Sequence, residues 1–257
     1  MEQPVISGRT GLIMQIKTVV NLEYACNARH LGGYRCEREL VTKDNAFIRC
    51  ENLEQLTSKD IAMLAKLGVT DAIDLRCPGE CMERPSAFSK LREIAYHNIP
   101  VFDADCSPGN LAAAGYDMIR FYMNMAEYAG QRLADILRCM ILSDGGVIFY
   151  CAMGKDRTGV VAALLLLVAG VDKETVVNEY CYTEQVSQPL RKEFLQFQPE
   201  GLEKKFDRDV LSAKKEYINA FIEQSAGKHG GAVSYLMNLG IKAHEIDAMR
   251  RKILQNN

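Results

Sequence analysis

The stretch from Gly145 to Gly170 constrains the fold more than any other part of the chain. Val147 to Tyr150 is a short apolar run after two glycines, which predicts a buried strand. Thr158 to Ala169 is apolar on all sides, which is typical of a helix buried within a domain. The short loop Cys151 to Arg157 joins them. This order predicts an anion site, because the first turn of a helix has free N–H groups and the positive end of the helix dipole.

The loop reads C-A-M-G-K-D-R and is followed by Thr158. A loop of this length can turn successive N–H groups toward one bound phosphate, and these belong to Ala152, Met153, Gly154, Lys155, Asp156 and Arg157. Cys151 then lies beneath the phosphate, and the Arg157 guanidinium grips two of its oxygens. The same groups favour the thiolate form of Cys151. A buried structural cysteine is the alternative, but it leaves the adjacent Gly-Lys-Asp-Arg-Thr unexplained.

This loop resembles the Cys-x5-Arg-Ser/Thr loop of the cysteine-dependent protein tyrosine phosphatase superfamily. CAMGKDRTG is most similar to the bacterial tyrosine/serine phosphatase branch, whose loop reads HCxxGKDRTG. Residues 27–33, N-A-R-H-L-G-G, resemble the N-x-R-D-L-G-G motif of that branch. The resemblance implies hydrolysis of phosphotyrosine first, with phosphoserine, phosphothreonine and phosphoinositides as further substrates. Two residues depart from the pattern: Tyr150 replaces the usual His, and His30 replaces the usual Asp.

These departures leave a second function open, namely a catalytically weak phosphatase-like module that binds phosphorylated ligands. The Cys, Asp, Arg and Thr of the loop count against it. A P-loop NTPase is excluded, because Phe149 occupies the first glycine position of G-x-x-x-x-G-K-[ST] and Asp156 follows Lys155. An arsenate reductase or rhodanese-like enzyme shares a cysteine–anion loop, but G-K-D-R-T-G does not belong to those loops.

The expected mechanism forms a phosphocysteine on Cys151, with Arg157 and the loop N–H groups stabilising the phosphate oxygens. The resemblance implies that Asp156 is the general acid, and Asp103, which follows a predicted strand, is its rival. Thr158 can hydrogen-bond the thiolate. Lys155 either adds positive charge at the mouth of the site or is a solvated loop lysine. Tyr150 can still donate a hydrogen bond near the loop.

Further strands are predicted at 47–50, 69–75 and 94–101, with a helix that starts at Thr57. This alternation predicts an α/β fold in which helices flank a central, mostly parallel sheet. Ligands gather beyond the carboxyl ends of such strands. Arg76, at the end of 69–75, therefore either faces the same crevice as Cys151 or braces the loop through Glu80 or Glu83.

Further helices are predicted in the rest of the chain. Two apolar stripes fit helices, and they comprise Ile119, Tyr122, Met123 and Ala126, then Leu133, Ile136, Leu137 and Met140. Extra C-terminal helices are expected at about 211–226, 232–238 and 243–254. We expect one phosphatase-like domain over 1–257, in which about 183–240 form either a helical lid or ordinary packing helices.

Composition limits the class of protein further. A net charge of −2 gives no basic surplus for nucleic acid. Nine cysteines without a C-x-x-C pair indicate reduced thiols rather than a disulfide framework or zinc site. No metal or cofactor is expected, because arginine and backbone supply the electrostatics. The N-terminus lacks a signal-peptide pattern, and the longest apolar run, 160–169, is too short to span a bilayer. A cytoplasmic protein with a phosphorylated protein or phosphoinositide substrate is expected, and the oligomeric state stays open.

Overall fold

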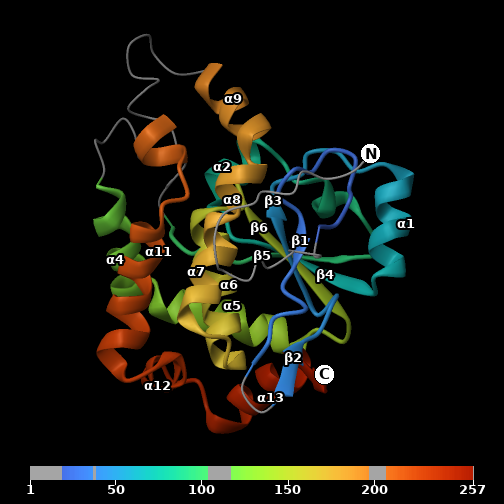
Figure 1. The fold of residues 1–257 in the computed structure, drawn as a ribbon. Helices are drawn as coiled ribbons and strands as arrows, with labels where there is room; N and C mark the ends of the chain where they lie inside the picture. The colour runs from blue at the N-terminus through green and yellow to red at the C-terminus, as the bar shows by residue number, and fades with distance from the viewer. Residues whose placement is uncertain (1–18, 37–38, 104–116, 197–206, 257) are drawn as a thin grey trace, which may run out of the picture.

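The fold is built on a central five-stranded sheet (Figure 1). The computed structural model describes residues 19–36, 39–103, 117–196 and 207–256. The strand order is β1-β3-β6-β4-β5. Their bounds are β1 (Arg29–His30), β3 (Phe47–Glu51), β6 (Gly146–Cys151), β4 (Val69–Asp74) and β5 (Ala95–Asn98). The strands β3, β6, β4 and β5 run parallel, and β1 is antiparallel to β3. The predicted mostly parallel sheet is therefore confirmed.

The parallel strands end at one edge of the sheet, and this edge carries the motif residues. In the register of β3 and β6, Glu51 pairs with Cys151, and Asp74 of β4 pairs with Tyr150. The segments after these strands therefore meet beside the loop at Cys151. The strand predicted at 94–101 is shorter than expected, because pairing with β4 covers only Ala95–Asn98.

Helices cover both faces of the sheet, and each face has its own apolar core (Figure 1). The larger core lies under the helices α4 (Met118–Tyr128), α5 (Gly130–Leu142), α6 (Asp156–Ala169) and α7 (Lys173–Cys181). The smaller core lies under α1 (Ser58–Lys66) and the 3-10 turn η2 (Ala87–Lys90). The predicted start of α1 is confirmed, since Thr57 and Asp60 form a reciprocal capping box. The helix α2 (Pro78–Glu83) follows β4.

The apolar stripe predicted for α4 is partly wrong. Tyr122 and Ala126 are buried as expected, but Ile119 and Met123 are 42% and 38% exposed. Phe121 and Met125 are buried instead, so the buried face of α4 is turned by about one residue. The stripe predicted for α5 is confirmed, because all four of its residues are buried.

Within the described ranges, the C-terminal part of the chain is helical, including the segments predicted near 211–226, 232–238 and 243–254, and it returns to the start of the fold. Its elements are α8 (Thr183–Val186), α9 (Gln188–Gln196), the π-helical turn η3 (Asp207–Leu211), α11 (Lys215–Ile222), the π-helical turn η4 (Glu223–Gly227), α12 (Ala232–Asn238) and α13 (Ala243–Ile253). A strand that the sequence did not predict, β7 (Leu254–Asn256), pairs with β2 (Leu40–Thr42). The single domain and the lid over about 183–240 remain predictions.

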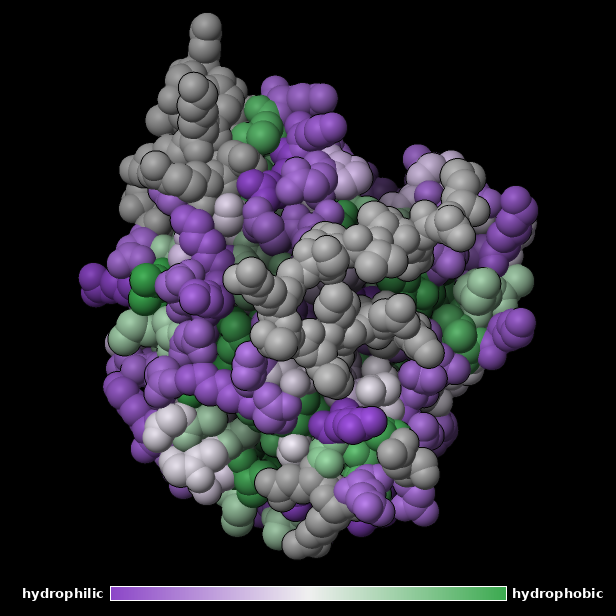
Figure 2. Space-filling view, in the orientation of Figure 1, coloured by the Kyte–Doolittle hydropathy of each residue, from purple (hydrophilic) through white to green (hydrophobic). Residues whose placement is uncertain are grey.

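The surface shown in Figure 2 is mostly hydrophilic, with hydrophobic residues in small separate patches. Within the described ranges, no helix combines the length and apolar character needed to cross a membrane.

Candidate active site

The loop at Cys151 leaves the central strand and enters α6 without a capping side chain. Cys151 is the last residue of β6, and α6 begins at Asp156. Within the described part of the chain, no side chain caps the first turn of α6, which leaves its N–H groups for an anion. Gly154 has a φ of 63°, and a Cβ there would lie 2.3 Å from the carbonyl oxygen of Cys50. A side chain at this position is therefore incompatible with the loop lying against β3.

Three successive carbonyl groups of the loop are hydrogen-bonded away from its centre. The Asn52 N–H donates to the Ala152 oxygen at 3.2 Å. The Asn27 amide donates to the oxygens of Met153 and Gly154, at 3.0 and 3.2 Å. Because these carbonyls point outward, the N–H groups of the loop are left to face a bound anion.

A buried charge cluster holds the back of the loop. The Arg49 Nη2 donates to the Gly154 oxygen at 2.6 Å, and its Nη1 donates to Glu179 at 2.6 Å. Glu179 also accepts from Arg29 at 2.7 Å, and Arg29 donates to Asn27. Burial alone would raise the pKa of Glu179, but the charges of Arg29 and Arg49 hold it below its ordinary value. The N-A-R segment therefore supports the loop through Asn27 and Arg29.

Arg157 forms a buried, two-pronged ion pair with Glu80 of α2. Its Nη1 and Nη2 donate to Glu80 Oε2 and Oε1, at 2.6 and 2.8 Å. Burial would raise the pKa of Glu80, but the hydrogen bonds and charge of Arg157 hold it below its ordinary value. Such a fork-to-fork pair fixes the plane of the guanidinium in the first turn of α6.

Asp156 and Lys155 are bonded to each other and to surrounding elements. The Tyr122 hydroxyl donates to Asp156 Oδ1 at 2.7 Å, and Lys155 Nζ lies 3.0 Å from the same oxygen. Lys155 is fully buried and also donates to the carbonyls of Val210 and Ser212, at 2.6 and 3.0 Å. Both expectations for its side chain, a charge at the mouth or a solvated lysine, are therefore wrong. Its backbone N–H remains a predicted phosphate donor.

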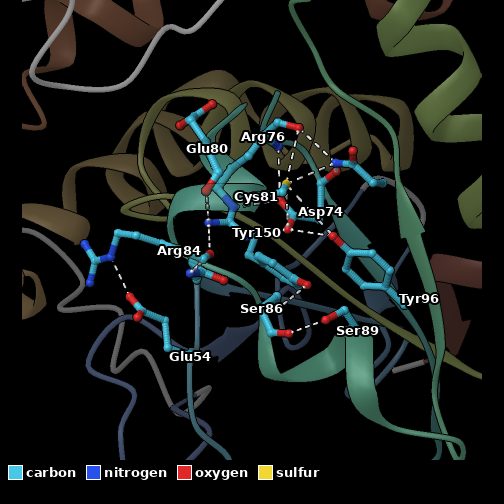
Figure 3. Close-up of polar contacts among 12 residues, drawn as sticks. Glu54, Asp74, Arg76, Glu80, Cys81, Arg84, Ser86, Ser89, Tyr96 and Tyr150 are labelled. Carbon is cyan, nitrogen blue, oxygen red and sulfur yellow. Dashed lines mark hydrogen bonds and ion pairs between the residues drawn. The ribbon is translucent and has the colours of Figure 1, made fainter. Parts of the chain in front are cut away.

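Tyr150 faces away from Cys151. Adjacent strand residues point to opposite faces; Tyr150 belongs to the smaller core and Cys151 to the larger one. The Tyr150 hydroxyl lies 2.7 Å from the Ser86 hydroxyl (Figure 3). The Tyr150 ring stacks on Phe88. The hydrogen bond expected of Tyr150 therefore goes to Ser86. His30 also has a local partner, since its ring accepts the N–H of Asn45 at 3.2 Å.

Arg76 braces the segment after β4, and it does so through Asp74 rather than through a glutamate side chain. Its Nε and Nη2 donate to Asp74 at 2.9 and 2.7 Å, and its Nη1 donates to the Arg84 carbonyl at 2.7 Å (Figure 3). With 1% of its surface exposed, Arg76 is committed to these contacts. The bracing role is confirmed, but the side chains predicted for it, those of Glu80 or Glu83, do not provide it: Arg76 reaches only the Glu80 carbonyl, at 3.4 Å, and the Glu80 carboxylate binds Arg157.

Asp103 and Thr158 have contrasting environments. The Asp103 side chain is 78% exposed and pairs with Arg132 at 2.9 Å. Thr158 is fully buried, and its hydroxyl has no hydrogen-bond partner among the described residues. A buried hydroxyl without a partner costs free energy, and the predicted bond to the Cys151 thiolate would satisfy it.

Sequence reasoning missed Arg49, Glu179 and Tyr122, and it gave Glu80 the wrong partner. Each is a single residue on an element far from the loop in the sequence. Tyr122 appeared only as one member of an apolar stripe. The signal that was present is Asn27-Ala28-Arg29, which belongs to the motif that resembles N-x-R-D-L-G-G. Within the described ranges, no group of three or more His, Cys, Asp or Glu side chains is placed to hold a metal ion.

A model of the tyrosine phosphatase family matches residues 20–255. The chain therefore belongs to the tyrosine phosphatase family and is a phosphatase. It is 27% identical to a tyrosine-protein phosphatase of Nostoc commune, covering 86% of this chain and 78% of that protein. It is 24% identical to the triple specificity protein phosphatase PtpB of Mycobacterium tuberculosis, covering 80% of this chain and 90% of that protein. These relatives confirm the resemblance to the bacterial branch.

Among solved structures, TpbA of P. aeruginosa is 16% identical and covers 72% of this chain and 90% of that chain, with a TM-score of 0.33. That score is too low to support an argument, and the fold is described from the strands and helices above.

The Glu80–Arg157 pair predicts an acid-dependent loss of stability. Because the folded pKa of Glu80 is lowered, its contribution is complete above the unfolded pKa of about 4.3 and is lost as pH falls through the folded value. Glu80→Gln should lower the free energy of unfolding at neutral pH by about 3 kcal/mol, because it leaves a buried arginine without its counter-charge. The difference from the wild type should shrink in a urea-unfolding series toward about pH 3.

Glu193→Gln is the matched control. Glu193 pairs with Arg84 at 2.7 Å on the surface, where 43% of its side chain is exposed. Such a pair contributes less than about 1 kcal/mol, so this variant should stay close to the wild type throughout. If the difference in free energy of unfolding between Glu80→Gln and the wild type does not change with pH, Glu80 is not the charged partner of Arg157.

Proposed function

We propose that the protein hydrolyses phosphoric monoesters through a phosphocysteine on Cys151. The main support for this proposal is the structure of the loop at Cys151. A buried cysteine ends the central strand, three successive carbonyls are tied outward, and an uncapped helix start carries Arg157. Thiolate, N–H groups and guanidinium are the groups that phosphoryl transfer from an ester to sulfur requires.

In the first step, the Cys151 thiolate attacks phosphorus in line with the leaving oxygen, and Asp156 protonates that oxygen. The N–H groups of residues 152–157 and Arg157 stabilise the equatorial oxygens. In the second step, water attacks the phosphocysteine and Asp156 accepts its proton. The P–S bond breaks, which releases inorganic phosphate and the Cys151 thiolate. The side chain of Asp156 is 15% exposed, so it is accessible from the site. Asp103, paired with Arg132 at the surface, is the weaker candidate for the acid.

We propose phosphotyrosine as the main substrate, with phosphoserine, phosphothreonine and phosphoinositides as further ones. The family description and the name of the Nostoc relative support phosphotyrosine, and the name of the Mycobacterium relative supports a broader range. The buried Lys155 argues against its side chain as a receptor for a second phosphate. Comparison of kcat/KM across a panel of phosphopeptides and phosphoinositides would rank these classes.

A catalytically weak binding module is the second function, and Tyr150 bears on it. Because the ring faces away from Cys151 and bonds Ser86, the replacement of the family His leaves the donors of the loop unchanged. This favours the enzyme. A metal-independent burst of p-nitrophenol from p-nitrophenyl phosphate, blocked by vanadate, would distinguish an enzyme from a binding module.

Cys151→Ser is expected to abolish turnover while phosphate and vanadate still bind, because the loop N–H groups and Arg157 remain. Turnover and binding are measured with p-nitrophenyl phosphate and by calorimetry. Cys139→Ser, which changes a partly buried free cysteine of α5, is the matched control and should keep full activity. Unchanged turnover in Cys151→Ser would remove the covalent mechanism.

Asp156→Asn is expected to slow an alkyl phosphate about a hundredfold and an activated aryl phosphate far less, because only the alkoxide leaving group needs a proton. Steady-state kcat/KM on both substrates measures this. Asp103→Asn should leave both rates near wild type. If Asp103→Asn shows the selective loss instead, Asp156 is not the acid.

A further inference from the structure

The two oxygens of the Asp156 carboxylate have different surroundings. Oδ1 accepts from the Tyr122 hydroxyl at 2.7 Å and lies 3.0 Å from Lys155 Nζ. No described residue donates a hydrogen bond to Oδ2. We propose that Tyr122 is a positioning residue that holds Oδ1, so that Oδ2 carries the proton exchanged with the substrate. This inference rests on the proposed function, in which Asp156 is the general acid.

The hydroxyl of Tyr122 is the middle of a short hydrogen-bonded chain. It lies 2.6 Å from the hydroxyl of Tyr180 on α7. A tyrosine has one hydroxyl proton, and that of Tyr122 is donated to Asp156. Tyr180 is therefore the donor to Tyr122. Burial, and then the charge of Asp156, raises the pKa of Tyr122 far above its ordinary value, so Tyr122 stays a donor at neutral pH.

Packing restricts this hydroxyl to one place. The Tyr122 ring is fully buried, and its centroid lies 6.0 Å from that of Tyr180 and 5.8 Å from that of Tyr217. The three rings come from α4, α7 and α11, which pack together (Figure 1). Gly159 makes the approach of Tyr180 possible, since a Cβ there would lie 2.9 Å from its ring. This close contact explains why the G-K-D-R-T-G sequence ends in a glycine.

Lys155 also binds Oδ1 of Asp156, so Lys155 and the Tyr122 hydroxyl together form the anchor of this oxygen. Three oxygens lie within hydrogen-bonding distance of its Nζ, and they belong to Val210, Ser212 and Asp156. An ammonium has three donors, so this lysine is committed to the anchor. Its position is set by the backbone beside η3 rather than by solvent.

The anchor has a defined part in the reaction. The Oδ2–H bond breaks, and the proton goes to the leaving oxygen, which receives the electron pair of the broken P–O bond. The negative charge left on Asp156 is stabilised by the Tyr122 hydroxyl and the Lys155 ammonium. In the second step, Oδ2 takes a proton from the water that attacks the phosphocysteine. Because Oδ1 stays bonded throughout, the carboxylate does not rotate between steps.

The test is leaving-group dependence in Tyr122→Phe. The lost hydrogen bond to a charged group should reduce kcat/KM on phenyl phosphate about tenfold, and on p-nitrophenyl phosphate less than about twofold, because the latter leaving group needs little protonation. Tyr235→Phe is the matched control. It removes another buried hydroxyl, which donates to the Ala126 carbonyl of α4 at 2.7 Å and does not touch Asp156. Tyr235→Phe should change kcat/KM by the same factor on phenyl phosphate and on p-nitrophenyl phosphate.

Asp156→Asn and the double variant separate this inference from the proposed function. In the Asp156→Asn background, adding Tyr122→Phe should change either rate less than about twofold, since the acid is already absent. If Asp156→Asn is leaving-group selective but Tyr122→Phe resembles Tyr235→Phe, the inference is wrong and the proposed function stands. If Asp156→Asn is not selective, the acid assignment fails and the inference fails with it.

Discussion

The outward hydrogen bonding of the loop carbonyls is the constraint on which the rest of the site depends. Asn27 and Arg49 bind the carbonyls of Met153 and Gly154, and a backbone N–H binds that of Ala152. Without these bonds, the carbonyl dipoles would be free to turn toward the place where an anion binds, and they would repel it. In the proposed mechanism, groups that never touch the substrate therefore preorganise the loop for an oxyanion.

Buried charges make this preorganisation costly to disturb. Glu179 forms ion pairs with Arg29 and Arg49, and Glu80 forms one with Arg157. All of these side chains have little exposed surface. Buried ion pairs contribute little net stability compared with apolar packing, but removing one partner costs about 3–5 kcal/mol. The arrangement therefore specifies one geometry for the loop more than it stabilises the fold. Arg157 and the loop are held by separate acids from different helices, so each can be perturbed independently.

Much of the fold and the loop at Cys151 could be predicted from the sequence, because their signals are local. Apolar runs gave the four parallel strands, and Cys151, Asp156 and Arg157 share one motif. The partners of the loop could not be predicted, because Glu80 and Glu179 are single acids on helices whose placement depends on tertiary packing. Lys155 was misjudged for the same reason, since its burial depends on backbone near residue 210. The pairing of β2 with β7 joins short segments from opposite ends of the chain and has no local pattern.

A crystal structure of the protein with vanadate would show whether the loop binds an oxyanion as proposed. We expect vanadium bonded to Cys151 Sγ, with its oxygens bonded to the N–H groups of residues 152–157 and to Arg157. The carbonyls of residues 152–154 should still be bonded to Asn52, Asn27 and Arg49. Vanadate bound elsewhere, or loop carbonyls that point into the cradle before the ligand binds, would contradict this proposal.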